Sequence, residues 1–127
     1  MARYQLHIPS DITPYPEKHE ITAAAILAQH FKQDATFLKR TSARTADLEI
    51  GNVCWEVKSP TGGGKRNIQH QFSKALKQSY NVVFDARRSK IHMAKIIHEL
   101  DKQFKMAKSI KRLVLITKAS KVIEFSR

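Results

Sequence analysis

Acidic residues and a lysine are spaced as strand neighbours on either side of a turn in the middle of the chain. The turn, Gly51-Asn52, is flanked by strand-forming residues. A two-residue turn there fixes the pairing of the two arms and places Asp47 opposite Glu56. Directly opposed side chains have Cβ atoms roughly 4.5 to 5.5 Å apart, where two carboxylates repel unless a cation lies between them. We therefore predict a divalent metal site, and hard carboxylate oxygens of this kind suit Mg²⁺ or Mn²⁺.

Lys58 lies two residues beyond Glu56, on the same face of the predicted strand, because side chains alternate along a strand. An ammonium group there can hold a water molecule or a phosphate oxygen beside the ion. The other face of the hairpin is apolar and comprises Leu48, Ile50, Val53, Trp55 and Val57. Alternating charges are also typical of the solvated side of an antiparallel hairpin. Predicted helices before and after this hairpin favour a central, partly buried position, and hence the metal site.

The elements that position the hairpin follow from the apolar periodicity. Helices are predicted over residues 17–31, 68–79 and 90–108, and further strands over 35–38, 82–86, 113–117 and 122–126, the last two as a hairpin. Glu20 borders the apolar stripe of the first helix, where it can add a third carboxylate. Residues 1–16 contain three of the four prolines and are predicted to be an extended lead-in. We expect a single α/β domain over residues 17–127, in the order α, β, β, β, α, β, then α, β, β.

Composition restricts the partners without choosing among them. The chain has 127 residues and a net charge of +12, a field that attracts nucleic acid, anionic membrane or an acidic protein. No apolar run is long enough to span a membrane, so we expect a soluble domain. The single cysteine, Cys54, excludes an internal disulfide framework and a thiolate zinc cluster.

Cations near the predicted site are candidates for substrate binding. The stretch SPTGGGKR, residues 59–66, lacks the spacing of a Walker A loop, so we expect no nucleotide cofactor. As a loop that leads into a helix, it can offer backbone N–H groups to a phosphodiester, although a surface loop with no ligand is equally consistent. For Arg87 and Arg88, which follow a strand end, structural pairing with Asp85 is an equal alternative. The candidate substrate-binding residues are Lys65, Arg66, Lys74, Gln78, Arg87 and Arg88.

The element order, with Asp47 before one strand and Glu56-Val57-Lys58 in the next, resembles the PD-(D/E)XK nuclease superfamily. Ala46 stands where the motif has proline. The resemblance implies a restriction-endonuclease-like αβββαβ core with a mixed sheet, here followed by an additional helix and a C-terminal β-hairpin. It also implies catalytic roles for Asp47, Glu56, Lys58 and Glu20, the last of which falls where many members carry a helix glutamate.

From Glu17 onward the chain is also similar to the C-terminal transfer-RNA nuclease domains of contact-dependent growth inhibition toxins and related polymorphic toxins. Residues 56–90 and 110–125 carry this similarity. It implies a metal-dependent ribonuclease that acts on tRNA in the cytoplasm of a target cell and is neutralised by a cognate immunity protein, which the positive charge of this chain predicts to be acidic. The alternatives are a DNA endonuclease of the same superfamily, a metal-independent toxin RNase that uses histidine, or a non-catalytic basic module that binds nucleic acid.

Overall fold

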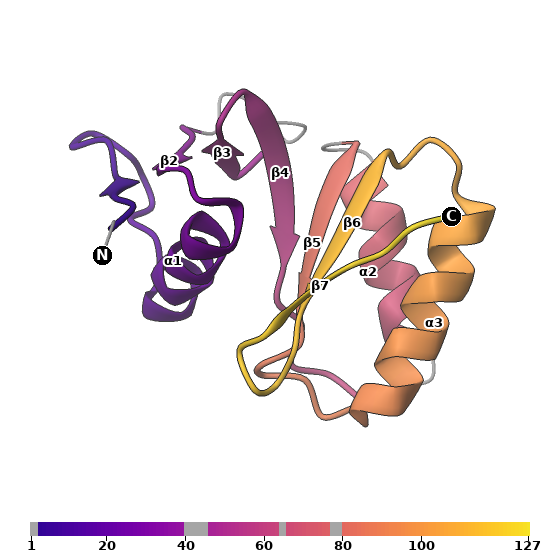
Figure 1. The fold of residues 1–127 in the computed structure, drawn as a ribbon. Coiled ribbons are helices and arrows are strands. Elements are labelled where there is room, and N and C mark those ends of the chain that lie inside the picture. Colours follow the sequence, from indigo (N-terminus) through magenta and orange to yellow (C-terminus); the bar gives the residue numbers. More distant parts are fainter. Residues whose placement is uncertain (1–2, 40–45, 64–65, 77–79) are drawn as a thin grey trace.

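A computed structural model describes residues 3–39, 46–63, 66–76 and 80–127, which fold into a single α/β domain with a seven-stranded mixed sheet (Figure 1). The elements in chain order are β1 (Leu6–His7), α1 (Lys18–Phe31), β2 (Ala35–Phe37), β3 (Leu48–Ile50), β4 (Val53–Lys58), α2 (Asn67–Leu76), β5 (Asn81–Asp85), α3 (Met93–Met106), β6 (Arg112–Ile116) and β7 (Val122–Glu124). None of the helices in this described part of the chain is long and apolar enough to cross a membrane.

Spatial strand order in the sheet follows the order along the chain. The pairs β2–β3, β3–β4 and β6–β7 are antiparallel, whereas β1–β2, β4–β5 and β5–β6 are parallel. Helix α1 packs on one face, and α2 and α3 lie on the other (Figure 1). The core on the α1 side includes Ala23, Leu27, Phe37, Trp55, Val83 and Val114. The core on the α2 and α3 side includes Phe72, Val82, Phe84, Ile96, Leu100 and Leu115.

The predicted element order from the first helix onward is confirmed, together with the mixed sheet and the C-terminal hairpin. Strand β1, within the predicted lead-in, is an addition. It pairs with β2, and Asp34 Oδ1 accepts a hydrogen bond of 2.9 Å from the backbone N–H of Gln5. A strand of two residues is too short to produce an alternating pattern, so the sequence gives no sign of it.

The β3–β4 hairpin has the predicted register, with Ile50 paired to Val53 and Leu48 paired to Trp55. Gly51 has a φ of +63°, in the left-handed region that favours glycine. A Cβ atom added there would lie 2.1 Å from the side-chain oxygen of Gln33. The turn therefore favours glycine because of its backbone conformation, whereas the flexible end of the Gln33 side chain can move away from an added Cβ atom.

Strand β4 changes partners halfway along its length. Residues 53–55 pair with β3, and residues 56–58 pair with β5. The sheet therefore forks between Trp55 and Glu56, at the end of β3 where Asp47 precedes the strand. This fork positions the acidic residues that the sequence singles out.

Candidate active site

Asp47 is held at the fork by both its backbone and its side chain. Its N–H donates to the carbonyl of Trp55 at 3.0 Å, and its Oδ2 accepts from the N–H of Val57, also at 3.0 Å. The carboxylate thus satisfies a β4 donor just beyond the point where the regular pairing with β3 stops. The hydrogen bond to Val57 holds the Asp47 side chain close to Glu56, the residue before Val57 on β4.

Glu56 is completely buried, with 0% of its surface exposed. Burial, a hydrogen bond with Asp47 and charge repulsion from Asp47 together raise the pKa of its carboxyl group from 4.5 to about 8, and burial is the largest of these effects. Lys58, whose Nζ lies 3.2 Å from Glu56 Oε2, acts in the opposite direction. The structure therefore brings Asp47, Glu56 and Lys58 together. The predicted direct pairing of Asp47 with Glu56 is replaced by the bond from the Asp47 N–H to Trp55, and the Asp47 side chain lines a cavity on the α1 face. Their catalytic roles stay a prediction.

A cavity of about 170 Å³ opens beside Asp47 at the end of β4 and β5. Its polar lining is formed by His19, Glu20, Asp47, Ser59, Asp85 and Arg88, and its apolar lining by Ala23, Phe37, Leu48 and Val57. An adjoining groove of about 290 Å³ also has Glu20, Phe37 and Asp47 in its wall. The two hollows therefore meet at a pair of acidic residues.

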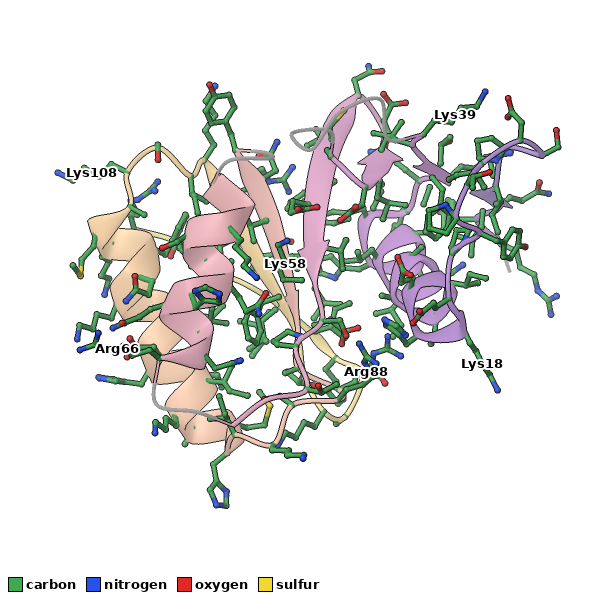
Figure 2. All side chains as sticks on the ribbon, turned by 180° about the vertical axis from the view of Figure 1, so that it is seen from behind. Lys18, Lys39, Lys58, Arg66, Arg88 and Lys108 are labelled. Atoms are coloured by element: carbon green, nitrogen blue, oxygen red, sulfur yellow. The ribbon has the colours of Figure 1, made fainter. Side chains whose placement is uncertain are left out.

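The third predicted carboxylate, Glu20, joins this arrangement from one side only. Glu20 and Asp47 line the same cavity on the α1 face of the sheet. Glu56 and Lys58 lie on the other face of β4, because the alternate residue Val57 packs against the core on the α1 side. Figure 2 shows Lys58 on the side of α2. Asp47 thus adjoins Glu20 in the cavity and Glu56 at the fork, whereas β4 separates Glu20 from Glu56.

The position of Glu20 follows from the start of α1. Glu17 is the N-cap residue, and Glu20 Oε1 accepts a hydrogen bond of 3.0 Å from its backbone N–H in a capping box. This bond uses one carboxylate oxygen of Glu20. The side chain therefore stabilises the helix terminus as well as lining the cavity.

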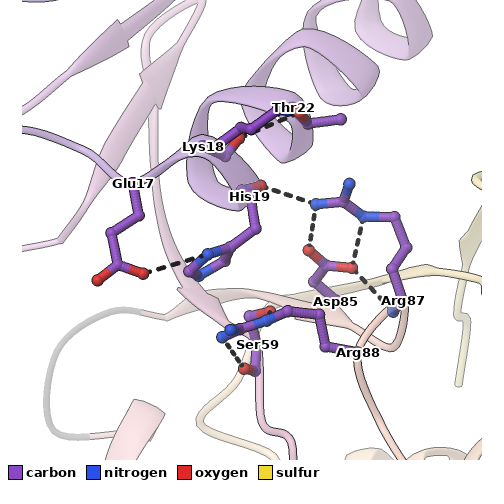
Figure 3. Close-up of polar contacts among 8 residues, drawn as sticks. All are labelled: Glu17, Lys18, His19, Thr22, Ser59, Asp85, Arg87 and Arg88. Carbon is purple, nitrogen blue, oxygen red and sulfur yellow. Dashed lines mark hydrogen bonds and ion pairs between the residues drawn. The ribbon is translucent and has the colours of Figure 1, made fainter.

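His19 is a cavity residue that the sequence analysis did not single out. Its side chain is 21% exposed, and its Nδ1 lies 3.3 Å from Glu17 Oε2 (Figure 3). Candidate ligand atoms of Glu17, His19 and Glu20 lie within 4.8 Å of one another, a spacing that could hold a metal ion. The available signal was its place next to Glu20 in the first turn of a helix.

Arg87 and Arg88 have different surroundings. Arg87 donates from Nε and Nη2 to the two oxygens of the buried Asp85, at 3.0 and 2.7 Å, and also from Nη2 to the carbonyl of His19 at 2.7 Å (Figure 3). Arg88 is exposed, lines the cavity and donates to the hydroxyl and carbonyl oxygens of Ser59 at 3.2 and 2.9 Å. Arg87 therefore makes the structural ion pair with Asp85 that was the alternative to substrate binding, whereas Arg88 lines the cavity.

The remaining predicted substrate-binding residues lie on or near α2. Arg66 and Lys74 are exposed, and Figure 2 shows Arg66 next to the start of this helix. Lys65 and Gln78 lie outside the described residues. Substrate binding by all of these side chains stays a prediction.

A family model and a solved structure both relate this chain to toxins of contact-dependent growth inhibition. The family model described as the contact-dependent growth inhibition CdiA C-terminal domain matches residues 44–122. No curated protein sequence matches. Among solved structures, the chain is similar to one in the CdiA-CT/CdiI toxin and immunity complex from Burkholderia pseudomallei, with 17% identity and a TM-score of 0.65 over 97% of this chain and 99% of that one. That likeness supports the fold, and the family match, which spans more than half of the sequence, shows that this chain belongs to the CdiA C-terminal toxin domains of contact-dependent growth inhibition.

Proposed function

We propose that this toxin domain is a metal-dependent endonuclease of the PD-(D/E)XK type that hydrolyses phosphodiester bonds of RNA, with tRNA as the substrate. The observation that carries the proposal is the fork in the sheet, where the carboxylate of Asp47 adjoins the buried Glu56. Lys58 Nζ lies 3.2 Å from Glu56 Oε2 at the same place. An acid at a strand start followed by Glu-x-Lys on the next strand is the pattern of that superfamily.

The side chains present fit a divalent cation. Burial and Asp47 together raise the pKa of Glu56 to about 8, so the Glu56 carboxyl group holds a proton at neutral pH when no cation is bound. A divalent ion would offset the cost of ionising the buried Glu56 beside Asp47, and carboxylate oxygens are the ligands that Mg²⁺ and Mn²⁺ prefer. Asp47 and Glu56 would hold the ion, and Glu20, which β4 separates from Glu56, would assist only from the cavity side of Asp47.

Each side chain has a distinct contribution in this proposal. A bound divalent ion supplies Lewis-acid polarisation of a phosphoryl oxygen and lowers the pKa of a coordinated water. Lys58 fixes the orientation of Glu56 through their ion pair, and its other N–H groups can orient the attacking water or donate to a phosphate oxygen. Arg88, at the cavity, can screen the negative charge that develops on the phosphate.

Nucleic acid is the substrate class that the charge favours. The net charge of +12 attracts polyanions, and the exposed Arg66, Lys74 and Arg88 are cations suited to phosphate contacts. The choice of tRNA rests on the resemblance to the tRNA nuclease toxins. We further propose that the domain acts in the cytoplasm of a target cell and that an acidic immunity protein neutralises it. The second part is supported by the similar Burkholderia toxin, whose structure is a complex with an immunity protein.

The test uses purified protein with total tRNA and, separately, with plasmid DNA, in Mg²⁺ or in EDTA. Wild type should cleave tRNA in Mg²⁺ only, and Asp47→Ala and Glu56→Gln should lose at least about 100-fold of this activity. Glu49→Gln is the matched control, because Glu49 lies in the same hairpin, where it pairs with Cys54. Full activity in EDTA would refute the metal-dependent mechanism, and cleavage of the plasmid but not of tRNA would make DNA the substrate.

One observation favours a second candidate, a metal-independent RNase. His19 lines the cavity beside Arg88, a pair that could serve as a general base and a phosphate-binding cation. In this case cleavage would persist in EDTA and would be lost in His19→Gln. His70, His92 and His98, which could also act as an acid or base in such an RNase, are exposed and do not line the cavity.

A further inference from the structure

The lead-in segment forms one wall of the groove that reaches the acidic residues. Residues 12–16 line this groove together with Leu38, which follows β2. Glu20, Phe37 and Asp47 complete its lining and continue into the cavity. The volume of about 290 Å³ is near the lower end of the roughly 300–1,000 Å³ typical of small-molecule sites. A segment predicted to lie outside the functional domain thus borders its candidate active site.

The lead-in is fixed in place by contacts on both sides of the groove wall. Strand β1 pairs with β2, and Asp11 Oδ2 accepts from Lys39 Nζ at 2.6 Å. Pro16 is buried at the start of α1. Because each proline ring restricts its own φ, Pro14 and Pro16 limit the backbone on both sides of Tyr15. The wall is therefore ordered before any ligand binds.

Tyr15 is an exposed part of this wall, with 64% of its surface accessible although it lines the groove. The large apolar side chains exposed in the described part of the chain are Tyr15, Tyr80, Ile97 and Met106. An aromatic ring has few rotatable bonds, so ordering it on a fixed backbone costs little entropy. Such a ring is a suitable stacking platform for a nucleobase, a contact worth roughly 1–3 kcal/mol per base.

We infer that Tyr15 and the groove behind it form a stacking subsite for an unpaired nucleotide next to the scissile phosphate. The inference rests on the proposed nuclease function, because the groove ends at Asp47 and Glu20. Proteins that read single-stranded RNA stack splayed bases on aromatic side chains, whereas duplex bases are already stacked on one another. The subsite therefore selects loops and ends of RNA over helical stems.

The test measures binding separately from cleavage. A fluorescein-labelled 12-nucleotide single-stranded RNA and a 12-base-pair RNA duplex are titrated in EDTA at 0.15 M salt, and anisotropy gives the Kd. Tyr15→Ala should weaken single-strand binding about five- to 150-fold, the equivalent of losing one stacked base, and leave duplex binding within about twofold. Tyr15→Phe should bind as wild type. Tyr80→Ala is the matched control, because Tyr80 is 60% exposed and does not line the groove.

A second variant gives a direct signal at the ring. Tyr15→Trp should show emission that single-stranded RNA quenches and duplex RNA does not, while Trp55 stays buried. The inference is overturned if Tyr15→Ala binds the single strand as tightly as Tyr80→Ala does, if duplex binding falls equally, or if the introduced Trp is not quenched. These outcomes are independent of cleavage: a wild type that cleaves no nucleic acid would refute the proposed function alone.

Discussion

Replacing Glu56 by Gln should make the domain more stable at pH 8 than wild type. The raised pKa means that the folded protein binds the Glu56 proton more tightly than the unfolded chain does. Stability from this group is therefore fully present below the unfolded pKa of 4.5 and is lost as the pH rises through the folded value of about 8. Gln is neutral at every pH, so the variant should not lose stability in this interval.

The size of the effect follows from the same pKa values. A rise from 4.5 to about 8 corresponds, at about 1.4 kcal/mol per pKa unit, to at most about 5 kcal/mol. Between pH 5 and 8 the wild-type free energy of unfolding should therefore fall by about 3–4 kcal/mol through this group. Other carboxyl groups have lowered pKa values and contribute stability that is lost only on acidification, outside this interval; they are Asp11, Asp34, Glu99 and Glu124.

Urea unfolding in EDTA at pH 5, 6.5 and 8 measures this dependence. The difference between Glu56→Gln and wild type should increase with pH, whereas Glu49→Gln, an exchange in the same hairpin, should follow wild type. If wild type and Glu56→Gln lose the same stability between pH 5 and 8, Glu56 is not the group that titrates. The account of a buried acid pair at the fork would then be wrong.

Four further perturbations test the same geometry and the surrounding fold. At pH 8, millimolar Mg²⁺ should raise the melting temperature of wild type and not that of Glu56→Gln; by calorimetry, the binding should release protons that Glu56 holds in the free protein. Asp47→Asn retains an oxygen that can accept from the Val57 N–H, so it should unfold at a higher urea concentration than Asp47→Ala, which loses about 1–3 kcal/mol with that acceptor. Gly51→Ala should cost about 1–2 kcal/mol in the same assay, because its φ of +63° lies in the left-handed region that L side chains disfavour. Arg127→Ala should lower the melting temperature, measured by circular dichroism, because its guanidinium donates to the carbonyls of Phe104, Ala107 and Ile110 at the end of α3.

The sequence was sufficient for the hairpin because its information is local. A Gly-Asn turn with alternating residues on both arms determines the register of residues 48–50 with residues 53–55, and this register brings Asp47 near Glu56. It does not show that the Asp47 N–H donates to Trp55 and that the Asp47 side chain lines the cavity on the α1 face, because the pairing becomes irregular at Asp47. The relation of Glu20 to Glu56 is not local. It depends on which face of the sheet α1 covers, and helical periodicity shows that Glu20 borders a buried stripe without showing which face that stripe meets.

The sequence could not determine which partner each charged side chain near the site would pair with. Asp85 and two arginines at a strand end are compatible with ligand binding or with internal pairing. The structure shows that Arg87 pairs with Asp85, whereas Arg88 lines the cavity. Strand β1 was undetectable because two residues form no period. The sequence predicts only an extended lead-in around Tyr15 for a related reason. The position of Tyr15 beside the groove depends on the pairing of β1 with β2 and on the Asp11–Lys39 ion pair, which are both tertiary contacts.

The fork also explains why these acids are unfavourable for stability and still suited to a reaction. A fold selected for stability alone would place an apolar side chain at the 0% exposed position of Glu56, because an acidic group buried beside a second carboxylate costs free energy above pH 5. That cost is removed by whatever brings positive charge to the pair, and Lys58 supplies only part of it. Strongly perturbed carboxyl groups are common in catalytic sites, and Glu56, whose pKa is raised, lies beside the cavity residue Asp47. Asp47 connects the two faces of the sheet, so the electrostatic cost at Glu56 and the access to substrate through the cavity depend on the same side chain.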